Sequence, residues 1–353
     1  MDYKKHSDLE NWFLSKPPES FPNKEDFVSL YKTLKTKLKQ VQKQVTQGAN
    51  ATDGTSLTWH DQSHIDMVAT QASHLLSYKE ATISPFETFI LLVAIQIHDV
   101  MNSDGRDEHE NRATDIFSIL NIGGIIDSVI KRAISDVVAS HSGSFTRGTE
   151  KERDKISYLL PSIYPLKGEK IKMRFLAAIL RLADEYADNE NRALSYLLQL
   201  GKIEKLSEIH QKYAHCLHSV TIEKNTGIIE FDFHVQLPDA QMMFEKFDKE
   251  KQTVENVYLI DEIFCRTIKS HYETIYCMRF MRPYINIDKL SIMIEIEVSD
   301  ITKKLRATYE LVEKGYPNTY QNIYDLCQDQ LKLNGGLWSG LYIKEYIEKH
   351  NLN

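Results

Sequence analysis

The chain has 353 residues, of which 42% are hydrophobic and 26% are charged, and its formal net charge is −7. This is the composition of an ordinary globular protein with enough apolar residues for a sizeable core, and the negative charge excludes a uniformly basic nucleic-acid binder. Nucleic-acid binding stays possible through a local basic face, but the sequence does not indicate it.

The N-terminus is polar and lacks the apolar stretch of a signal peptide. The most apolar run, residues 86–100, is shorter than the roughly 18 residues that a membrane span requires. Only four cysteines occur, with no closely spaced pair, which fits a reducing compartment. We therefore expect a cytoplasmic protein that is not inserted in a membrane.

Helical segments dominate the first part of the chain. Residues 1–50 form an N-terminal segment in which Leu30, Leu34 and Leu38 recur at helical spacing. A loop rich in Gly, Thr, Asn and Asp follows. Five further helices are expected, at residues 61–78, 86–100, 108–120, 125–141 and 169–187. Pro85 starts the second of them, and a charged loop follows the fourth.

The pattern changes near residue 216. The stretch "HSVTIEKNTGIIEFDFHVQL" predicts two strands joined by a turn, a helix is expected at about 250–279, and "KLSIMIEIEVSD" alternates as a further strand. The last fifty residues are expected to be helical. The predicted fold class is mainly α, with a small α+β module and a helical C-terminus, divided into residues 1–50, 51–215, 216–300 and 301–353.

A buried helix that ends in His98-Asp99 requires an explanation, because a buried polar pair is costly unless it is hydrogen-bonded or holds a metal. Other such residues lie on or near the ends of predicted helices with apolar faces. Several helices can bring such side chains to one interior point, as the metal sites of helical bundles do. The candidates are His64, His98, Asp99, His109, His141 and Asp184.

The order of these residues resembles that of the HD-domain phosphohydrolase superfamily. The matching pieces read "SHIDMV", "IQIHDV", "DEHENRA", "VVASHSG" and "ILRLADEYA", and they span about residues 58–195. The chain is also similar to HD proteins of bacterial conflict and antiviral defence systems. The resemblance implies an HD-type helical bundle. His215, His218 and His234 lie outside the matching region and receive no role.

The resemblance also implies one or two divalent metal ions. His64, His98, Asp99 and Asp184 would hold the first ion, and Asp99 would bridge to a second ion held by His109 and His141. His98, Asp99 and His109 would be the catalytic residues. Imidazole and carboxylate ligands suit Mn, Fe, Co, Ni or Zn better than Mg alone.

Several assignments have alternatives. His60 lies four residues before His64 and could share its helix face, His109 could lie at a solvated helix start, and His141 could be a helix C-cap. Cations suited to substrate phosphates are Arg106 and Arg112, which flank His109, and Arg181. Arg181 shares a helix face with Asp184, so it could bind phosphate or pair with a carboxylate.

The implied activity is metal-dependent hydrolysis of phosphate ester or anhydride bonds in nucleotides, either triphosphates or a second messenger. Triphosphohydrolases of the superfamily usually carry another histidine soon after the doublet, whereas this chain has Val100-Met101-Asn102-Ser103. One alternative is a nucleotide sensor that signals to a partner protein, and another is an oxygenase with two irons. Expected partners are the nucleotide substrate and a second copy of the chain or a defence-system protein.

Overall fold

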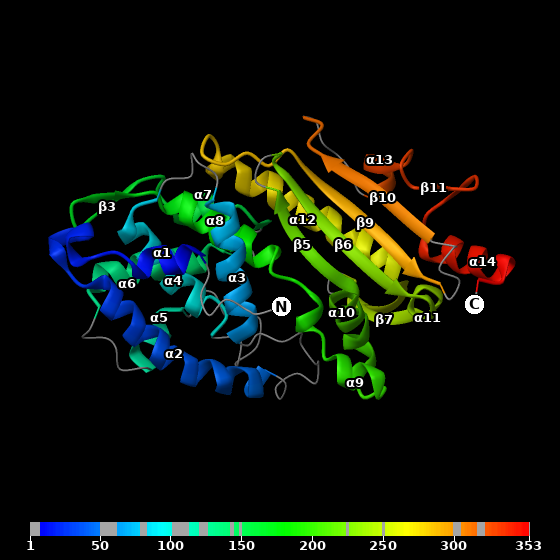
Figure 1. The fold of residues 1–353 in the computed structure, drawn as a ribbon, viewed down its shortest axis with the longest axis horizontal. Helices are drawn as coiled ribbons and strands as arrows, with labels where there is room; N and C mark the ends of the chain where they lie inside the picture. The colour runs from blue at the N-terminus through cyan, green and yellow to red at the C-terminus, as the bar shows by residue number, and fades with distance from the viewer. Residues whose placement is uncertain are drawn as a thin grey trace. The chain divides into compact units, whose positions relative to one another are not determined.

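The computed structural model describes residues 8–49, 62–77, 83–100, 113–119, 126–141, 145–147, 150–223, 226–248, 251–298, 305–315 and 322–352 (Figure 1). Contacts divide the chain into two compact units. The first unit contains residues 1–53, 60–187 and 276–286, and the second contains residues 54–59, 188–275 and 287–353. Among the described residues, no helix combines the length and the apolar character needed to span a bilayer.

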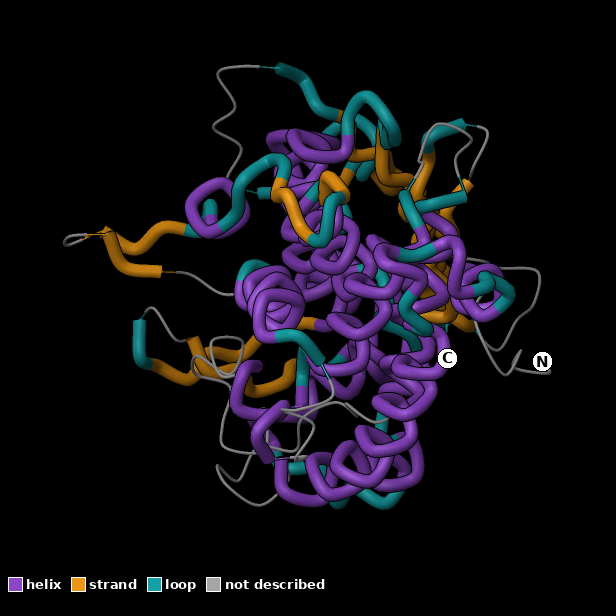
Figure 2. Tube along the Cα trace, turned by 90° about the vertical axis from the view of Figure 1, so that its left-hand side faces the viewer, coloured by secondary structure: helices purple, strands orange, loops and turns teal. Residues whose placement is uncertain are grey.

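The first unit consists mainly of helices, which are purple in Figure 2, with two short antiparallel strand pairs. The helices are α1 (Asp8–Leu14), α2 (Phe27–Ala49), α3 (Gln62–Leu75), α4 (Pro85–Ile97), α5 (Ala113–Ile119), α6 (Ser128–Ala139), α7 (Lys155–Leu159) and α8 (Met173–Glu185). Three-residue 3₁₀ turns at Pro18–Ser20 and Pro22–Lys24 join α1 to α2. The strand pairs are β1 (Phe145–Arg147) with β2 (Glu150–Glu152) and β3 (Tyr164–Leu166) with β4 (Glu169–Ile171).

Helix α4 forms the centre of this unit, and every residue from Phe86 to Ile97 is buried. Its start is fixed by a capping box: Ser84 Oγ accepts from the backbone N of Glu87 at 3.1 Å, and the Glu87 carboxylate accepts from the backbone N of Ser84 at 2.9 Å. Proline is favoured directly after such a cap because its missing N–H costs nothing there. The predicted start at Pro85 is confirmed.

The Glu87 side chain also connects the start of α4 with the start of α8. Its Oε1 accepts a hydrogen bond of 2.8 Å from the backbone N of Lys172, the residue that precedes α8, and the Lys172 ammonium lies 3.5 Å from Oε2. Glu87 is buried, so these contacts replace the hydration that the carboxylate loses. The N-terminal ends of α4 and α8 are therefore held together.

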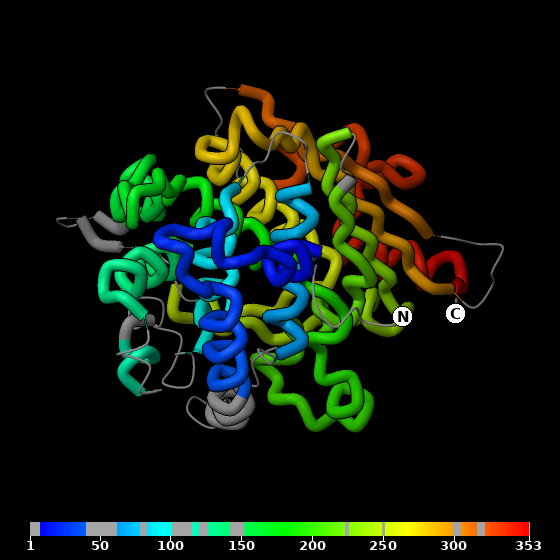
Figure 3. The backbone as a smooth tube through the Cα atoms, turned by 60° about the vertical axis from the view of Figure 1, so that its left-hand side comes forward, coloured from blue at the N-terminus to red at the C-terminus, as the bar shows by residue number. Residues whose placement is uncertain are grey.

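The second unit is built on a four-stranded sheet in the order β10-β9-β6-β5. β6 and β9 pair in parallel although two helices and a strand pair separate them in the chain (Figure 3), and the other neighbours are antiparallel. The strands are β5 (Leu217–Glu223), β6 (Ile228–Gln236), β9 (Lys289–Glu297) and β10 (Leu305–Val312). Gly227, at φ 67°, supplies the left-handed backbone of the turn between β5 and β6.

Alternate residues of this sheet are buried, as expected for a sheet with one packed face. Helix α12 (Leu259–Met281) contributes to the packed face: Thr267 Oγ1 and Tyr309 Oη lie 2.8 Å apart, and the rings of Phe264 and Tyr309 lie 5.6 Å apart. The remaining elements are η5 (Glu190–Arg192), α9 (Ser195–Gln199), α10 (Lys205–Cys216), α11 (Leu237–Gln241), β7 (Met243–Asp248), β8 (Thr253–Tyr258), α13 (Ile323–Cys327), β11 (Lys332–Leu333), β12 (Gly336–Leu337) and α14 (Gly340–His350).

The fold is mainly α with an α+β module, as predicted. Three local predictions were wrong. The expected charged loop after α6 contains the pair β1–β2, and the helix expected from about residue 250 begins at Leu259, after β8. The C-terminal segment, expected to be helical, carries β10, because Leu305, Ala307, Tyr309 and Leu311 alternate onto the buried face of the sheet.

Candidate metal centre

His98 and Asp99 lie where α4 ends. His98 is the C-cap residue, and its backbone is still helical at φ −57° and ψ −36°. Its side chain is fully buried, whereas that of Asp99 is 13% exposed. Nδ1 of His98 lies 2.8 Å from the carbonyl oxygen of Ile95. Because a carbonyl can only accept, Nδ1 carries a hydrogen and Nε2 is the atom that faces the centre.

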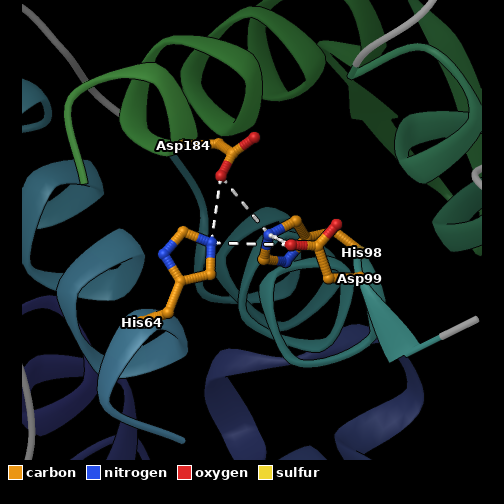
Figure 4. Close-up of side chains that lie close together, drawn as sticks. All are labelled: His64, His98, Asp99 and Asp184. Carbon is orange, nitrogen blue, oxygen red and sulfur yellow. Dashed lines mark ion pairs between the residues drawn. The ribbon is translucent and has the colours of Figure 1, made fainter. Parts of the chain in front are cut away.

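Two other helices bring His64 and Asp184 to the same place (Figure 4). His64 is buried on α3, and Asp184 lies in the last turn of α8 with a side chain that is 28% exposed. Nε2 of His64 lies 3.1 Å from Asp184 Oδ1 and 3.6 Å from Asp99 Oδ2. Nε2 of His98 lies 3.4 Å from Asp99 Oδ2 and 3.5 Å from Asp184 Oδ1. One atom from each of the four residues lies within 4.8 Å of the other three.

This donor set fits a divalent metal ion. Two imidazole nitrogens and two carboxylate oxygens are ligands that suit Mn, Fe, Co, Ni and Zn. Nε2 of the buried His98 has no hydrogen-bond partner among the described residues, although two carboxylate oxygens face it. A cation between the nitrogens and the oxygens would satisfy both kinds of atom. The identity and number of ions do not follow from these four side chains.

The electrostatics of the centre also favour a cation. Burial acts to lower the pKa of His98, but the carboxylates of Asp99 and Asp184 outweigh it and raise that pKa well above its ordinary value. Desolvation acts to raise the pKa of Asp184, but interactions with His64 and His98 hold it well below its ordinary value. The carboxylates that keep a proton on His98 are the same groups that would attract a metal ion.

The family comparison agrees with this geometry. The HD-CE family model matches residues 44–246, which is more than half of the chain and includes all four residues of the centre. The chain belongs to the HD-CE family. Searches of curated proteins and of solved structures find no match. The HD-type domain predicted from the order of the histidines and aspartates is therefore confirmed.

A third histidine lies beside the group of His64, His98, Asp99 and Asp184, which we call the HD centre. His141 follows α6 and is buried, and the centroids of the His98 and His141 rings lie 5.3 Å apart with the rings edge to face. Nδ1 of His141 lies 2.5 Å from the carbonyl oxygen of Val138, three residues earlier, which repeats the contact of His98 with Ile95. The same nitrogen, Nε2, is thus the one that His141 can offer to a ligand.

Other sequence-predicted residues of the HD domain lie outside the described residues. They are His60, Arg106, His109 and Arg112. Arg181 is described: it is buried on α8, and its guanidinium lies 4.5 Å from the centroid of the Tyr276 ring. From the sequence, phosphate or a carboxylate was the expected partner of Arg181, and an aromatic ring was not predicted.

Tyr276 also lies in this region and was not predicted from the sequence. The ring of Tyr276 stacks on Arg181. Its hydroxyl donates to Asp154 Oδ1 at 3.0 Å and accepts from the backbone N of Ile156 at 3.0 Å. Tyr276 belongs to the first unit and thus connects the C-terminal end of α12 with α8 and the start of α7 within that unit. A single tyrosine in a helix almost a hundred residues after Arg181 carries no sequence signal of such a contact, and only covariation between the two positions could have shown it.

Proposed function

We propose that this HD-CE protein is a metal-dependent phosphohydrolase that cleaves phosphate ester or anhydride bonds of nucleotides. The observation that carries the proposal is the convergence of His64, His98, Asp99 and Asp184 from three helices onto one point. The two histidines are fully buried, whereas the two carboxylates are partly exposed. A substrate would therefore approach from the carboxylate side of the centre.

The first metal ion would be held by these four side chains. A divalent ion supplies Lewis acidity, which neutralises charge on phosphoryl oxygens and makes a water molecule acidic enough to attack phosphorus at neutral pH. The carbonyl of Ile95 orients the His98 ring, and the helix end at His98 turns Asp99 toward the centre. These contacts fix the ligands before the substrate arrives, so less reorganisation is needed during the reaction.

We further propose a second ion held by Asp99, His109 and His141. The support for it is the position of His141, whose ring adjoins that of His98 and whose Nδ1 is tied to a backbone carbonyl in the same way. Two ions would suit hydrolysis of a monoester or diester. In this scheme His98, Asp99 and His109 are the catalytic residues, and Arg106, Arg112 and Arg181 bind substrate phosphates.

We also propose a substrate class, a biological role, partners and a metal for this protein. The proposed substrates are deoxynucleoside or nucleoside triphosphates or a nucleotide second messenger. The similarity of the sequence to conflict-system HD proteins supports a role in bacterial antiviral defence, with a second copy of the chain or a defence protein as partner. Manganese is the first metal to test, because it accepts both imidazole and carboxylate ligands.

Metal analysis of the purified protein, followed by a nucleotide panel, tests the proposal. The panel contains deoxynucleoside and nucleoside triphosphates and cyclic mono- and dinucleotides, each assayed with Mn²⁺, Co²⁺ or Mg²⁺. Release of tripolyphosphate, of inorganic phosphate, or of a linear nucleotide from a cyclic one identifies the reaction. Asp184→Asn should abolish the activity, whereas Asp136→Asn, which alters a half-buried aspartate on α6, is the matched control and should not.

Two results would contradict the proposal. One is a purified protein that neither contains nor binds a divalent ion. The other is hydrolysis that proceeds equally well in the parent protein and in Asp184→Asn. Nucleotide binding without turnover, retained in Asp99→Ala, would instead identify a nucleotide sensor.

A further inference from the structure

The second unit contains another group of histidines and carboxylates, at an irregularity between β5 and β6. Leu217 pairs with Phe233, but Ser219 pairs with Asp232, so His218 is an extra residue in β5. Such a β-bulge redirects a side chain relative to a regular strand, and bulges are frequent beside functional sites. In this strand the bulge brings His218 over His234 of β6: the ring centroids lie 4.9 Å apart and the ring planes differ by 17°.

A carboxylate lies beside each ring. Glu190 Oε2 lies 3.7 Å from His218 Nδ1, and Asp232 Oδ1 lies 3.3 Å from His234 Nε2. All four residues belong to the second unit and come from η5, β5 and β6. Their side chains are 28% to 52% exposed, so an ion in solution can reach them.

One atom of this group favours a bound ligand. Asp232 Oδ1 is shielded from solvent and has no hydrogen-bond partner among the described residues. A shielded carboxylate oxygen that accepts no hydrogen bond is costly, because desolvation of its charge is not offset. His234 Nε2 lies 3.3 Å from this oxygen, and a cation bound to both atoms would remove that cost.

We propose that His218, His234 and Asp232 bind a divalent transition-metal ion of borderline softness, for which Zn²⁺ is the reference, with Glu190 as the fourth ligand. Two imidazoles with carboxylate oxygens are a common ligand set for four-coordinate Zn²⁺. The rings are stacked in this structure, so binding requires rotation of the half-exposed His218 about its side-chain bonds. The bound ion would join β5, β6 and η5, which is a structural role separate from hydrolysis.

Metal titration of the full chain tests this site. All measurements use the Cys265→Ser background, because the Cys265 thiol is exposed and thiolates are zinc ligands that would add to the titration. We expect the His218→Ala, His234→Ala double variant to bind one equivalent of Zn²⁺ fewer than its parent. Asp232→Asn preserves the shape of the side chain and removes its charge, and it should raise the dissociation constant of this Zn²⁺ ion at least tenfold. His350→Ala removes an exposed histidine of α14 and is the matched control.

A second readout separates loss of the site from loss of the fold. Zn²⁺ should raise the melting temperature of the parent by more than that of the double variant, while the metal-free proteins melt alike. If the double variant binds as many equivalents as the parent, or if His350→Ala loses an equivalent equally, the proposal is overturned. Because the double variant retains the HD centre, any nucleotide hydrolysis should be unchanged, so this proposal and the proposed function can fail independently.

Discussion

Two buried histidines, one in each unit, have opposite electrostatic environments. His98, at the end of α4, faces the carboxylates of Asp99 and Asp184, and its pKa is raised well above the ordinary value despite its burial. His271, on α12, is 3% exposed, and desolvation alone lowers its pKa to about 4. Burial is the same in both cases, so the neighbouring carboxylates decide whether a buried histidine attracts a cation or stays neutral. This difference distinguishes a candidate metal ligand from a core residue.

The largest effect is expected at the HD centre. Asp99→Ala removes a ligand from the proposed first ion and the bridge to the second, which should lower hydrolytic turnover roughly a thousandfold. Phosphate release measured with saturating Mn²⁺ checks this. His271→Leu alters a histidine that is equally buried but has no carboxylate beside it in the described part of the chain, and it should leave turnover within twofold. Equal losses of turnover in Asp99→Ala and His271→Leu would show that the different environments of His98 and His271 have no bearing on hydrolysis.

The next effect concerns the stability of the protein in acid. His271 is neutral in the folded state, and the unfolded chain takes up a proton below about pH 6.5, so the free energy of unfolding should decrease as the pH falls from 6.5 toward 4. The decrease attributable to His271 is at most about 3 kcal/mol. Urea unfolding of the parent and of His271→Leu across this range measures it. His271→Leu should lack this part of the pH dependence. If the free energy of unfolding changes with pH identically in the parent and in the variant, His271 is not the group responsible.

A somewhat smaller effect is expected from metal removal. An ion that binds the folded state at a free concentration about 100 times its dissociation constant stabilises that state by about 2.7 kcal/mol. Chelation should therefore lower the melting temperature of the parent protein. Asp184→Asn disrupts the HD centre, and in the His218→Ala, His234→Ala background, where the site between β5 and β6 is also removed, it should make the melting temperature insensitive to the chelator. A parent protein whose melting temperature does not respond would indicate that His98 and its carboxylates hold only a proton.

The smallest effects distinguish two roles of Arg181. If its guanidinium binds substrate phosphate, Arg181→Met should raise KM about tenfold with little change in kcat. Tyr276→Phe keeps the ring that stacks on Arg181 but removes the hydroxyl bonded to Asp154 and Ile156. It should lower the free energy of unfolding by about 1 kcal/mol and leave KM unchanged. An unchanged KM in Arg181→Met would make Arg181 a structural residue.

The parts of the HD domain that could be predicted from sequence depend on local signals. Ser84, Pro85 and the apolar run after them define α4, and His98-Asp99 directly follows it. Asp184 was recognisable because a carboxylate interrupts the apolar face of α8. The helical pattern places each of these residues at or near a helix end, and the resemblance to HD-domain proteins implied that they form one centre together with His64.

The features that could not be predicted depend on long-range pairing. The bulge at His218 exists only in the register of β5 with β6, and the sequence alone does not fix that register. The strand β10 was missed because its alternation is meaningful only beside β9. Tyr276 and Arg181 meet through tertiary packing, and neither residue type specifies the other.

The link between Glu87 and Lys172 has a consequence for how these helices can vary in length. Asp99 follows Glu87 by twelve residues, and Asp184 follows Lys172 by twelve residues. At about 1.5 Å per helical residue, each carboxylate is carried roughly 18 Å from the shared starting point, so the two arrive level with each other. One residue inserted into either interval would displace its carboxylate by about 1.5 Å and turn it by about 100°. A residue inserted into both intervals would turn both carboxylates away from His64, which comes from a third helix, so the spacings 87–99 and 172–184 are each fixed by the geometry of the centre.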